Sequence, residues 1–277
     1  MSILIHVFEK ENGMETRNVL ITGGSRGLGR AMALALAKQG HRVAVTGRDN
    51  RKLAEVVQEL PGGIAIDADV TDASHTKAVI AEVEKDLGPV DILINNAGIG
   101  GGDGGPQLFM DMSVDDWWRV QETNLRGPML YSHEVLPGMI ERGWGVIVNI
   151  GSYIAIRPMP ASTAYAASKA ALARFTDCLS ADLDGTGVQA FCISPGLVLT
   201  DMTRDLPFIK DIPESDFHQP EDIASHVCAL ASGDYGALSG LFLHVKDDLE
   251  ELRANAGRLR EERLYSLRID SLKGLIP

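Results

Sequence analysis

The chain is 277 residues long and 45% hydrophobic, which is enough for a sizeable core in one large α/β domain or two small ones. Its 26 basic residues against 38 acidic ones give a formal net charge of −12, which opposes binding to nucleic acid and to anionic membranes. We expect neither a membrane span nor a signal peptide, and three widely spaced cysteines without metal-type spacing fit a reducing cytoplasm.

Apolar, strand-like runs alternate with helical patterns along most of the chain. The first run leads into a glycine-rich turn and then a helix over about 27–39, which Gly40 ends. Asp49 or Asn50 can cap the next helix. Further helices are expected over about 74–87 and 114–142, in the segment that carries Tyr165 and Lys169 and ends at about 183, and from 220 onward. The seven expected strands are 19–21, 42–46, 64–66, 90–94, 146–150, 188–193 and 241–245.

Strands that alternate with helices need crossover connections, so the pattern predicts a Rossmann-type, doubly wound α/β fold with about seven parallel strands and helices on both faces. No domain-scale linker or internal repeat interrupts the chain. We therefore expect a single domain over 1–277, with an N-terminal appendage at 1–14 and a C-terminal extension at 247–277. In such sheets ligands bind at the carboxyl ends of the strands, where the strand order reverses.

Two groups of residues stand out for their chemistry. Tyr165 and Lys169 are four residues apart on an expected helix, so the phenol and the ammonium can converge on one point. A free phenol has a pKa of about 10, and a nearby cation should lower the pKa of Tyr165. Taken alone, such a pair is more often a solvated helix face.

The second group is the turn Thr22-Gly23-Gly24-Ser25-Arg26-Gly27-Leu28-Gly29, which follows the first strand. Gly23 permits a tight turn, while Gly27 and Gly29 allow a ligand or another backbone to approach closely. The helix that starts here offers free N–H groups and a positive dipole end to a pyrophosphate. A glycine-rich loop without a ligand is the alternative, since such a turn alone is weak evidence.

Together these motifs resemble the short-chain dehydrogenase/reductase family, in its single-domain branch of carbonyl and 3-oxoacyl reductases. The resemblance covers about 19–245, and the glycine spacing agrees with this family rather than with G-x-G-x-x-G folds. It rests on Thr22-Gly23-x-x-x-Gly27-x-Gly29, Asp69, Asn95-Asn96-Ala97-Gly98, Asn124, Ser152, Tyr165-x-x-x-Lys169 and Pro195-Gly196.

The resemblance implies four catalytic residues. Tyr165 would be the general acid in reduction and the general base in oxidation, and Ser152 would hold the substrate oxygen near it. Lys169 would also bind the nicotinamide ribose, and Asn124 would hold a water that connects Lys169 to solvent. For Asn124 the alternative is a buried side chain satisfied by the backbone.

The resemblance also implies where the cofactor would lie. Asp69 and Val70 would meet the adenine, although Asp69, like Asp72, can instead cap a helix. Val198 and Thr200 would hold the carboxamide, unless Thr200 merely caps the next helix. The full cofactor-binding set is Gly23, Ser25, Arg26, Gly27, Leu28, Gly29, Arg48, Asp69, Val70, Asn96, Ala97, Gly98, Tyr165, Lys169, Pro195, Gly196, Val198 and Thr200; no metal site is expected.

The end of the second strand favours NADP over NAD. An acidic residue there would bind the ribose 2′-hydroxyl, but Gly47 occupies that position and Arg48 comes next. Arg26 lies inside the glycine turn, and two guanidinium groups suit a 2′-phosphate. Asp49, one residue further, keeps NAD possible.

We therefore predict an NAD(P)-dependent oxidoreductase that transfers a hydride to or from a ketone, an aldehyde or a secondary alcohol. Neither a nucleic acid nor a membrane is expected as a partner. The alternatives are a dehydratase or epimerase and an NADP-binding sensor or scaffold without turnover. A homodimer or homotetramer is expected by resemblance. Pocket walls are expected from Tyr153, Ile154, Met159, Leu197, Met202 and the lid at about 199–218, with Met110, Met112, Phe208 and Phe217 as further candidates.

The segment after Lys246 departs from the family. Asp247 or Asp248 can cap a helix, after which three residues alternate like a strand. We expect the segment to fold over the lid or over a neighbouring subunit. The apolar helix face would hold Leu249, Leu252, Ala256 and Leu259, and the strand-like residues are Tyr265, Leu267 and Ile269.

Overall fold

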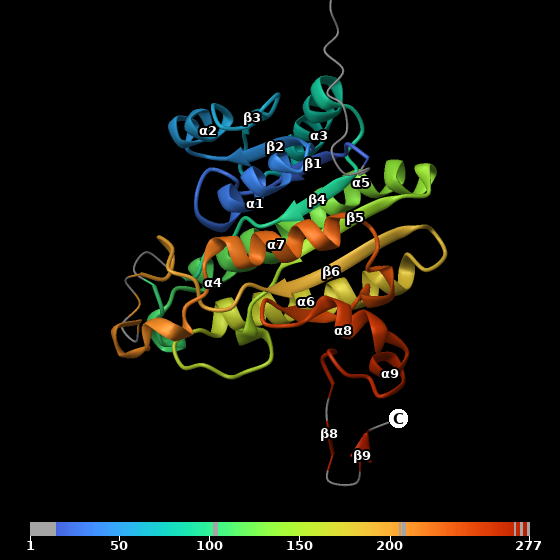
Figure 1. Ribbon diagram of the computed structural model, residues 1–277. Coiled ribbons are helices and arrows are strands. Elements are labelled where there is room, and N and C mark those ends of the chain that lie inside the picture. Colours follow the sequence, from blue (N-terminus) through green and yellow to red (C-terminus); the bar gives the residue numbers. More distant parts are fainter. Residues whose placement is uncertain are drawn as a thin grey trace, which may run out of the picture.

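Seven parallel strands form one sheet at the centre of the computed structural model, in the order β3-β2-β1-β4-β5-β6-β7 (Figure 1). The structure describes residues 15–101, 105–204, 206, 209–268, 270–271 and 274–275. The strand order reverses between β1 and β4, as in a doubly wound fold. The strands are β1 (Asn18–Ile21), β2 (Arg42–Gly47), β3 (Ile64–Asp67), β4 (Ile92–Asn95), β5 (Gly145–Ile150), β6 (Val188–Ser194) and β7 (Phe242–His244).

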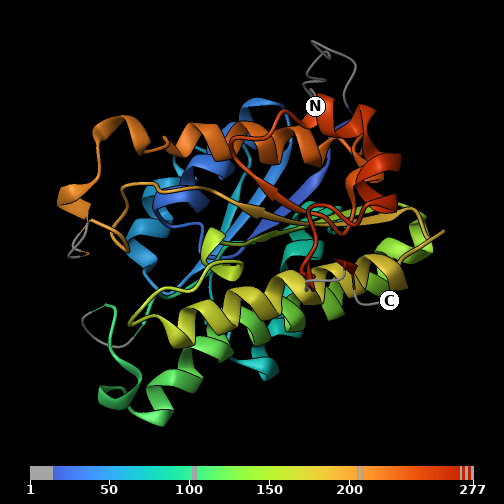
Figure 2. The same ribbon diagram turned by 90° about the horizontal axis from the view of Figure 1, so that it is seen from below.

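Helices cover both faces of this sheet, as Figures 1 and 2 show. One face carries α1 (Gly27–Lys38), α2 (Asn50–Val57) and α7 (Pro220–Ala231). The other carries α3 (Ala73–Leu87), α5 (Gly127–Arg142) and α6 (Thr163–Asp182). The predicted α/β fold with a parallel sheet is therefore confirmed.

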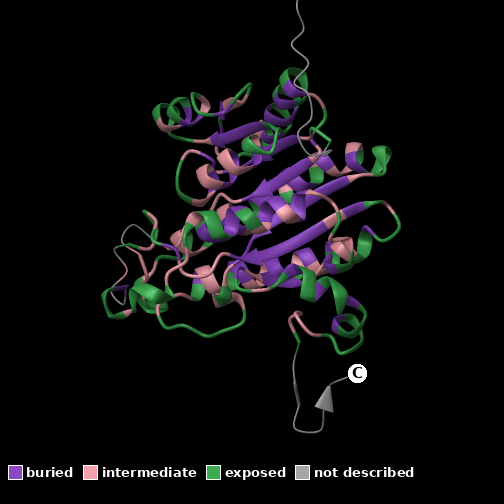
Figure 3. Ribbon diagram, viewed as in Figure 1, coloured by how far each residue is buried: buried purple, intermediate pink, exposed green. Residues whose placement is uncertain are grey.

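The two cores follow from the alternation of side chains along each strand. Val19 and Ile21 of β1 pack with α1 and α7, whereas Leu20 between them packs with α3 and α5. All three are fully buried, and the strands are the most buried part of the molecule (Figure 3). Burying one such side chain contributes about 1.5–3 kcal/mol, so the sheet rigidly positions the loops at its carboxyl edge.

Aspartate side chains cap the starts of α2 and α3. Asp49 accepts a hydrogen bond from the Lys52 amide at the start of α2. Asp72 accepts from the Ser74 and His75 amides at the start of α3, which is the capping role that the sequence allowed. Among the residues that the model describes, no helix is both long and apolar enough to cross a membrane.

The helix predicted over 114–142 is not uninterrupted. It consists of α4 (Val114–Gln121), a π-helical turn (Glu122–Arg126) and α5. Asn124 lies in the π-helical turn and is fully buried. Such a turn adds a residue to the helix and frequently marks a functional site, but periodicity alone cannot reveal it.

The C-terminal segment folds against the protein's own core rather than over the lid. It forms α8 (Leu249–Ala254), which Asp248 caps, and α9 (Ala256–Glu261). Leu249, Leu252, Ala256 and Leu259 are buried in the core on the α1 and α7 side, as their spacing predicted. The predicted strand at Tyr265 and Leu267 is wrong, because Tyr265 lies in a turn with a φ of 56°. Ile269, Phe208 and the appendage at 1–14 lie outside the described residues; the short strands β8 (Asp270–Ser271) and β9 (Gly274–Leu275) pair antiparallel.

Candidate active site

A cavity of about 2010 Å³ lies at the carboxyl edge of the sheet, where the strand order reverses. Small-ligand pockets usually measure about 300–1,000 Å³, so this one has room for a dinucleotide and a substrate together. All but two of the predicted site residues line it, and the exceptions are Gly29 and Asn124. Residues that follow the strand ends thus surround the cavity, as the parallel order of the strands predicts.

The glycine turn is held against the end of β4 by a small set of hydrogen bonds. The Asn96 side-chain amide donates to the carbonyl oxygens of Thr22 and Gly23, at 3.0 and 2.9 Å. A Cβ on Gly29 would lie 2.3 Å from the Gly23 carbonyl oxygen and 2.6 Å from Asn96 Nδ2. Gly29 is therefore required for the turn to close, and the Asn96 amide binds the turn.

Replacing Gly29 with alanine should weaken NADPH binding by about tenfold or more, or about 1.4 kcal/mol, because the new methyl group must displace the Gly23 carbonyl. Fluorescence titration of NADPH measures the change. Gly257→Ala is the control, since a Cβ there meets no atom within 4 Å. Equal affinity in the two variants would contradict this account of the turn.

The start of α1 fits a phosphate group. Arg26 at the N-cap makes no side-chain cap, and the first turn of α1 contains no acidic residue. Its terminal N–H groups therefore have no carboxylate competing for them, and Arg26, Gly27 and Leu28 all line the cavity. A positive helix end with open backbone donors is what a pyrophosphate needs.

The two arginines that we expected at the 2′ position are held by different acids. Arg26 Nη1 lies 2.6 Å from Asp201 Oδ2, and Arg48 Nη1 lies 3.5 Å from Asp69 Oδ2. Burial would raise the pKa of Asp69, but hydrogen bonds from the Thr71 amide and hydroxyl, with the Arg48 charge, outweigh it and leave that pKa below its usual value. Asp69 therefore remains ionised at neutral pH, and its bonds to Thr71 resemble the capping alternative.

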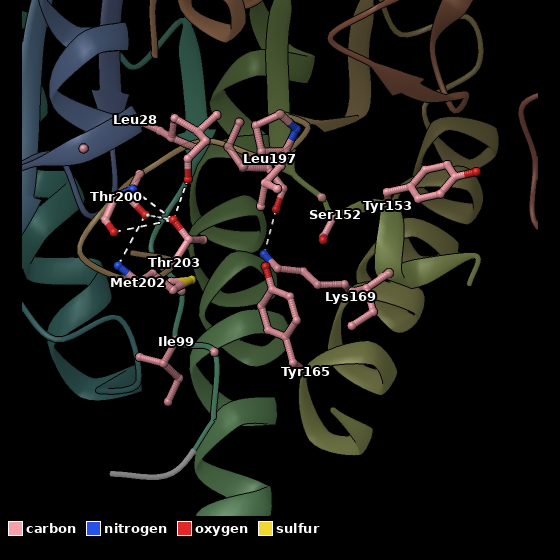
Figure 4. A pocket seen from close by; sticks show the side chains of 18 of the residues that line it. Leu28, Ile99, Ser152, Tyr153, Tyr165, Lys169, Leu197, Thr200, Met202 and Thr203 are labelled. Atoms are coloured by element: carbon pink, nitrogen blue, oxygen red, sulfur yellow. Dashed lines mark hydrogen bonds between the residues drawn. The ribbon is translucent and has the colours of Figure 1, made fainter. Parts of the chain in front are cut away.

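Ser152, Tyr165 and Lys169 meet at the wall of the cavity (Figure 4). Ser152 follows β5, and the other two come from α6. Lys169 Nζ donates to the Ile150 carbonyl oxygen at 2.7 Å and lies 5.7 Å from the centre of the Tyr165 ring. Burial lowers the pKa of Lys169 to about 8.

We predicted that a nearby cation would lower the pKa of Tyr165. Within the protein itself this prediction is wrong. Burial raises that pKa, and the hydrogen bond with Ser152 only partly opposes the rise. The ammonium of Lys169 is directed at the Ile150 carbonyl, so desolvation dominates. At neutral pH the phenol is protonated, which is the form that can donate a proton.

Asn124 does not reach the cavity with its side chain. Its Oδ1 accepts from the Ile99 amide at 2.8 Å, and its Nδ2 donates to the Ile99 carbonyl at 2.9 Å and to Ser168 Oγ at 3.0 Å. The side chain is thus buried and hydrogen-bonded to the Ile99 backbone and to Ser168. It ties the loop after β4 to α6, one residue before Lys169.

Some of the residues that we expected in the pocket walls line the cavity, and others do not. Met110, Met112 and Phe217 do not line the cavity, and Met110 is 84% exposed. Arg204 lines it and pairs with Asp201 at 2.7 Å. The residues that line it as expected are Tyr153, Ile154, Met159, Leu197 and Met202; those that we missed include Phe242, His244, Lys246, Tyr265 and Ser266.

Some of the missed residues were recognisable. His244 ends β7, and the rule that strand ends meet at one edge applies to it as well as to Ser152. A second missed group is a buried chain of side-chain hydrogen bonds, in which Asn95 donates to Asn149 at 2.9 Å and Asn149 to Thr176 at 2.8 Å. It joins β4, β5 and α6 beneath the site. Within the described part of the chain no cluster of three or more His, Cys, Asp or Glu residues could hold a metal.

Comparison with known proteins identifies the family. Residues 17–208 match the family model described as short chain dehydrogenase. A short chain dehydrogenase of Pseudocercospora fijiensis is 34% identical, over 94% of this chain and 91% of its own length. The 3-oxoacyl-[acyl-carrier-protein] reductase FabG of Staphylococcus aureus is 35% identical, over 83% of this chain and 96% of its own.

Solved structures agree with these relatives. A putative gluconate dehydrogenase from Agrobacterium tumefaciens has a TM-score of 0.76 at 32% identity and covers 82% of this chain and 93% of its own. An actinorhodin polyketide ketoreductase variant, determined with NADPH, has a TM-score of 0.77 at 30% identity and covers 83% of this chain and 95% of its own. The chain therefore belongs to the short-chain dehydrogenase/reductase family.

Proposed function

We propose that this chain is an NADP-preferring oxidoreductase that acts on a ketone, an aldehyde or a secondary alcohol. The observation that carries the proposal is the meeting of Ser152, Tyr165 and Lys169 in one cavity with the open start of α1. A reductase and an NADPH-bound ketoreductase among its relatives support the same chemistry.

Proton transfer is the part of the reaction that the chain itself performs. In reduction, Tyr165 donates its phenolic proton to the carbonyl oxygen, and in oxidation the phenolate takes the proton back from the alcohol. The hydroxyl of Ser152 holds the substrate oxygen beside the phenol, and the Lys169 ammonium stabilises the phenolate that forms. The bound cofactor supplies the hydride in reduction and accepts it in oxidation.

Different groups of residues would hold different parts of the cofactor. The start of α1, including Ser25 and Leu28, would bind the pyrophosphate, and Asp69 and Val70 the adenine. Arg26 and Arg48 would bind the 2′-phosphate once it draws them from their acidic partners. The floor and the nicotinamide side would be formed by Asn96, Ala97, Gly98, Lys169, Pro195, Gly196, Val198 and Thr200.

Two other functions make different demands on the site. An NADP-binding sensor or scaffold needs the nucleotide cavity but has no use for Ser152, Tyr165 and Lys169 together. A dehydratase or epimerase would use the cofactor transiently and leave it unchanged. Absorbance of NADPH with a panel of diketones, acetoacetyl esters, quinones and aldehydes tests the proposal: net oxidation of NADPH supports it, and binding without any oxidation across the panel favours the alternatives.

Arg48→Ala should weaken NADPH binding about ten- to a hundredfold, or 1.5–3 kcal/mol, and leave NADH binding nearly unchanged. The reason is that Arg48 lines the cavity and can leave Asp69 for a phosphate, which only NADPH carries. Titration of both cofactors measures the change. Arg51→Ala is the matched control, because Arg51 pairs with Glu55 on the exposed side of α2. Equal losses for NADPH and NADH would show that Arg48 does not recognise the 2′-phosphate.

We also propose a homodimer or homotetramer located in the cytoplasm. The exposed side of α4 and α5 carries apolar residues that water would otherwise cover: Trp118 is 59% exposed and Ile140 44%. Val114 and Met129 are exposed on the same two helices. Light scattering tests this assembly, and a monomeric mass would contradict it.

A further inference from the structure

The C-terminal segment contributes directly to the cavity. The Phe242 amide, on the free edge of β7, donates to the Tyr265 carbonyl oxygen at 2.8 Å. Tyr265 and Ser266 line the cavity, and Leu267 packs against the small core cluster of Ala173, Cys192 and Phe242, as Ala155 does. Ala155 belongs to the short turn that follows Ser152. The segment therefore covers the edge of the sheet at β7 and adds residues to the cavity wall.

Asp247 fastens this segment to the end of β7. Its Oδ2 accepts from the His244 amide at 2.6 Å, and its Oδ1 accepts from the Tyr265 hydroxyl at 3.2 Å. Its own amide donates to the His244 carbonyl at 2.9 Å. One carboxylate thus sets the positions of two cavity-lining residues that are 21 positions apart in the chain.

Tyr265 is held in an unusual backbone conformation. Its φ of 56° lies in the left-handed region, which bulky side chains rarely adopt. Such a conformation persists only where the surroundings enforce it, and these positions are frequent at ligand sites. The bonds to Phe242 and Asp247 supply that enforcement, so the placement of Tyr265 at the cavity is a specific feature of the fold.

Two more rings stand at the same end of the cavity. The rings of Tyr153 and His244 meet edge to face, with centres 5.9 Å apart and planes at 83°. Tyr153 is 50% exposed, and it points away from Tyr165, to the side of the reacting groups (Figure 4). His218 flanks His244 from the other side, with ring centres 6.1 Å apart. The cavity-lining side chains nearer the lid, such as Met159, Leu197 and Met202, are aliphatic, so the rings are concentrated in one place.

His244 behaves as a neutral aromatic ring in this position. Its Nδ1 accepts a hydrogen bond from the Lys246 amide at 3.1 Å, which leaves the proton of the neutral ring on Nε2. Burial also lowers the pKa of His244. Asp247 acts in the opposite direction, while His218, His226 and Lys246 oppose a positive charge. The ring therefore offers an uncharged face and one N–H donor at neutral pH.

We propose that Tyr153, His244 and Tyr265 form a ring-lined subsite beside Ser152 that binds the aromatic ring of a carbonyl substrate. The proposal rests on the proposed reductase function. An aromatic ring gains edge-to-face or offset contacts with these side chains that a saturated ring of the same size does not gain. Tyr153 directly follows Ser152 in the chain, so the subsite adjoins the residue that would hold the substrate oxygen.

The test compares acetophenone with cyclohexyl methyl ketone, which have the same carbon skeleton but differ in the aromaticity of the ring. Wild-type enzyme with NADPH should favour acetophenone in kcat/KM, and Tyr153→Leu and Tyr265→Leu should each reduce that preference about two- to tenfold. Tyr153→Phe and Tyr265→Phe keep the rings and should retain the preference. Dissociation constants measured by calorimetry with NADP present should show the same ratios without requiring turnover.

The outcomes separate this subsite from the proposed function. Equal affinity of the wild type for the two ketones, or a preference that neither leucine variant lowers, would overturn the subsite while reductase activity on other ketones stands. Failure to oxidise NADPH with any carbonyl compound would overturn the reductase proposal, and the calorimetric ratio would still decide whether the ring-lined subsite exists.

Discussion

Tyr165→Phe should lower the turnover of a carbonyl substrate by about 10²–10⁴-fold and leave NADPH affinity nearly unchanged. The substitution removes one hydroxyl and little volume, so the partly buried ring still packs beside Lys169 while the proton donor is lost. Steady-state kinetics and fluorescence titration of NADPH measure the two effects separately. A phenylalanine variant with near-full turnover would contradict the assignment of the proton donor.

The pH profile gives an independent view of the same residue. Because burial raises the pKa of Tyr165, the phenol stays protonated through neutral pH. Reduction should therefore be insensitive to the ionisation of Tyr165 near pH 7, whereas oxidation should accelerate as the pH rises. The Tyr165→Phe variant should lose this difference between the two directions.

Lys169→Met should abolish most turnover and yet stabilise the folded protein at pH 7, by up to about 3 kcal/mol less the cost of the lost hydrogen bond to the Ile150 carbonyl. The pKa of Lys169 falls from 10.5 to about 8 on folding, because its ammonium is buried. At pH 7 the lysine is charged in both the folded and the unfolded state, so folding must desolvate that charge. A methionine of similar length removes the desolvation penalty and also the ammonium that stabilises the phenolate.

The sign of the pH dependence follows from the lowered pKa. Between about pH 8 and pH 10.5 the unfolded state binds more protons at Lys169 than the folded state does, so wild-type stability from this group rises with pH. Chemical denaturation at pH 7 and pH 9.5 measures it. Lys38→Met, on the exposed end of α1, is the control and should change neither value much. A Lys169→Met variant that is less stable than wild type at pH 7 would contradict the account.

The parts of the fold that could be predicted depend on short stretches of chain. Val19, Leu20 and Ile21 alternate between two cores, and Asp72 caps the helix that follows it. The site could be predicted because many of its residues follow strand ends, which parallel strands bring to one edge, and because a four-residue spacing puts Tyr165 and Lys169 on one helix face. Local pattern and topology were together sufficient for these features.

The features that could not be predicted depend on residues distant in the chain. The π-helical turn is held where Asn124 meets the Ile99 backbone, 25 positions away. The pKa of Tyr165 depends on burial and on Lys169 being directed at Ile150, neither of which a helical spacing reveals. The turn at Tyr265 depends on the free edge of β7, to which its carbonyl bonds.

Isotope tracing follows the transferred hydride from the cofactor to the product. NADPH that carries deuterium at both C4 positions of the nicotinamide is incubated with wild-type enzyme and a ketone that the panel identifies. We expect one deuterium on the carbinol carbon of the alcohol for each NADPH oxidised, and no such product from Tyr165→Phe on the same timescale. Alcohol without deuterium at that carbon, or a changed substrate with NADPH unconsumed, would contradict the reductase and favour the alternatives.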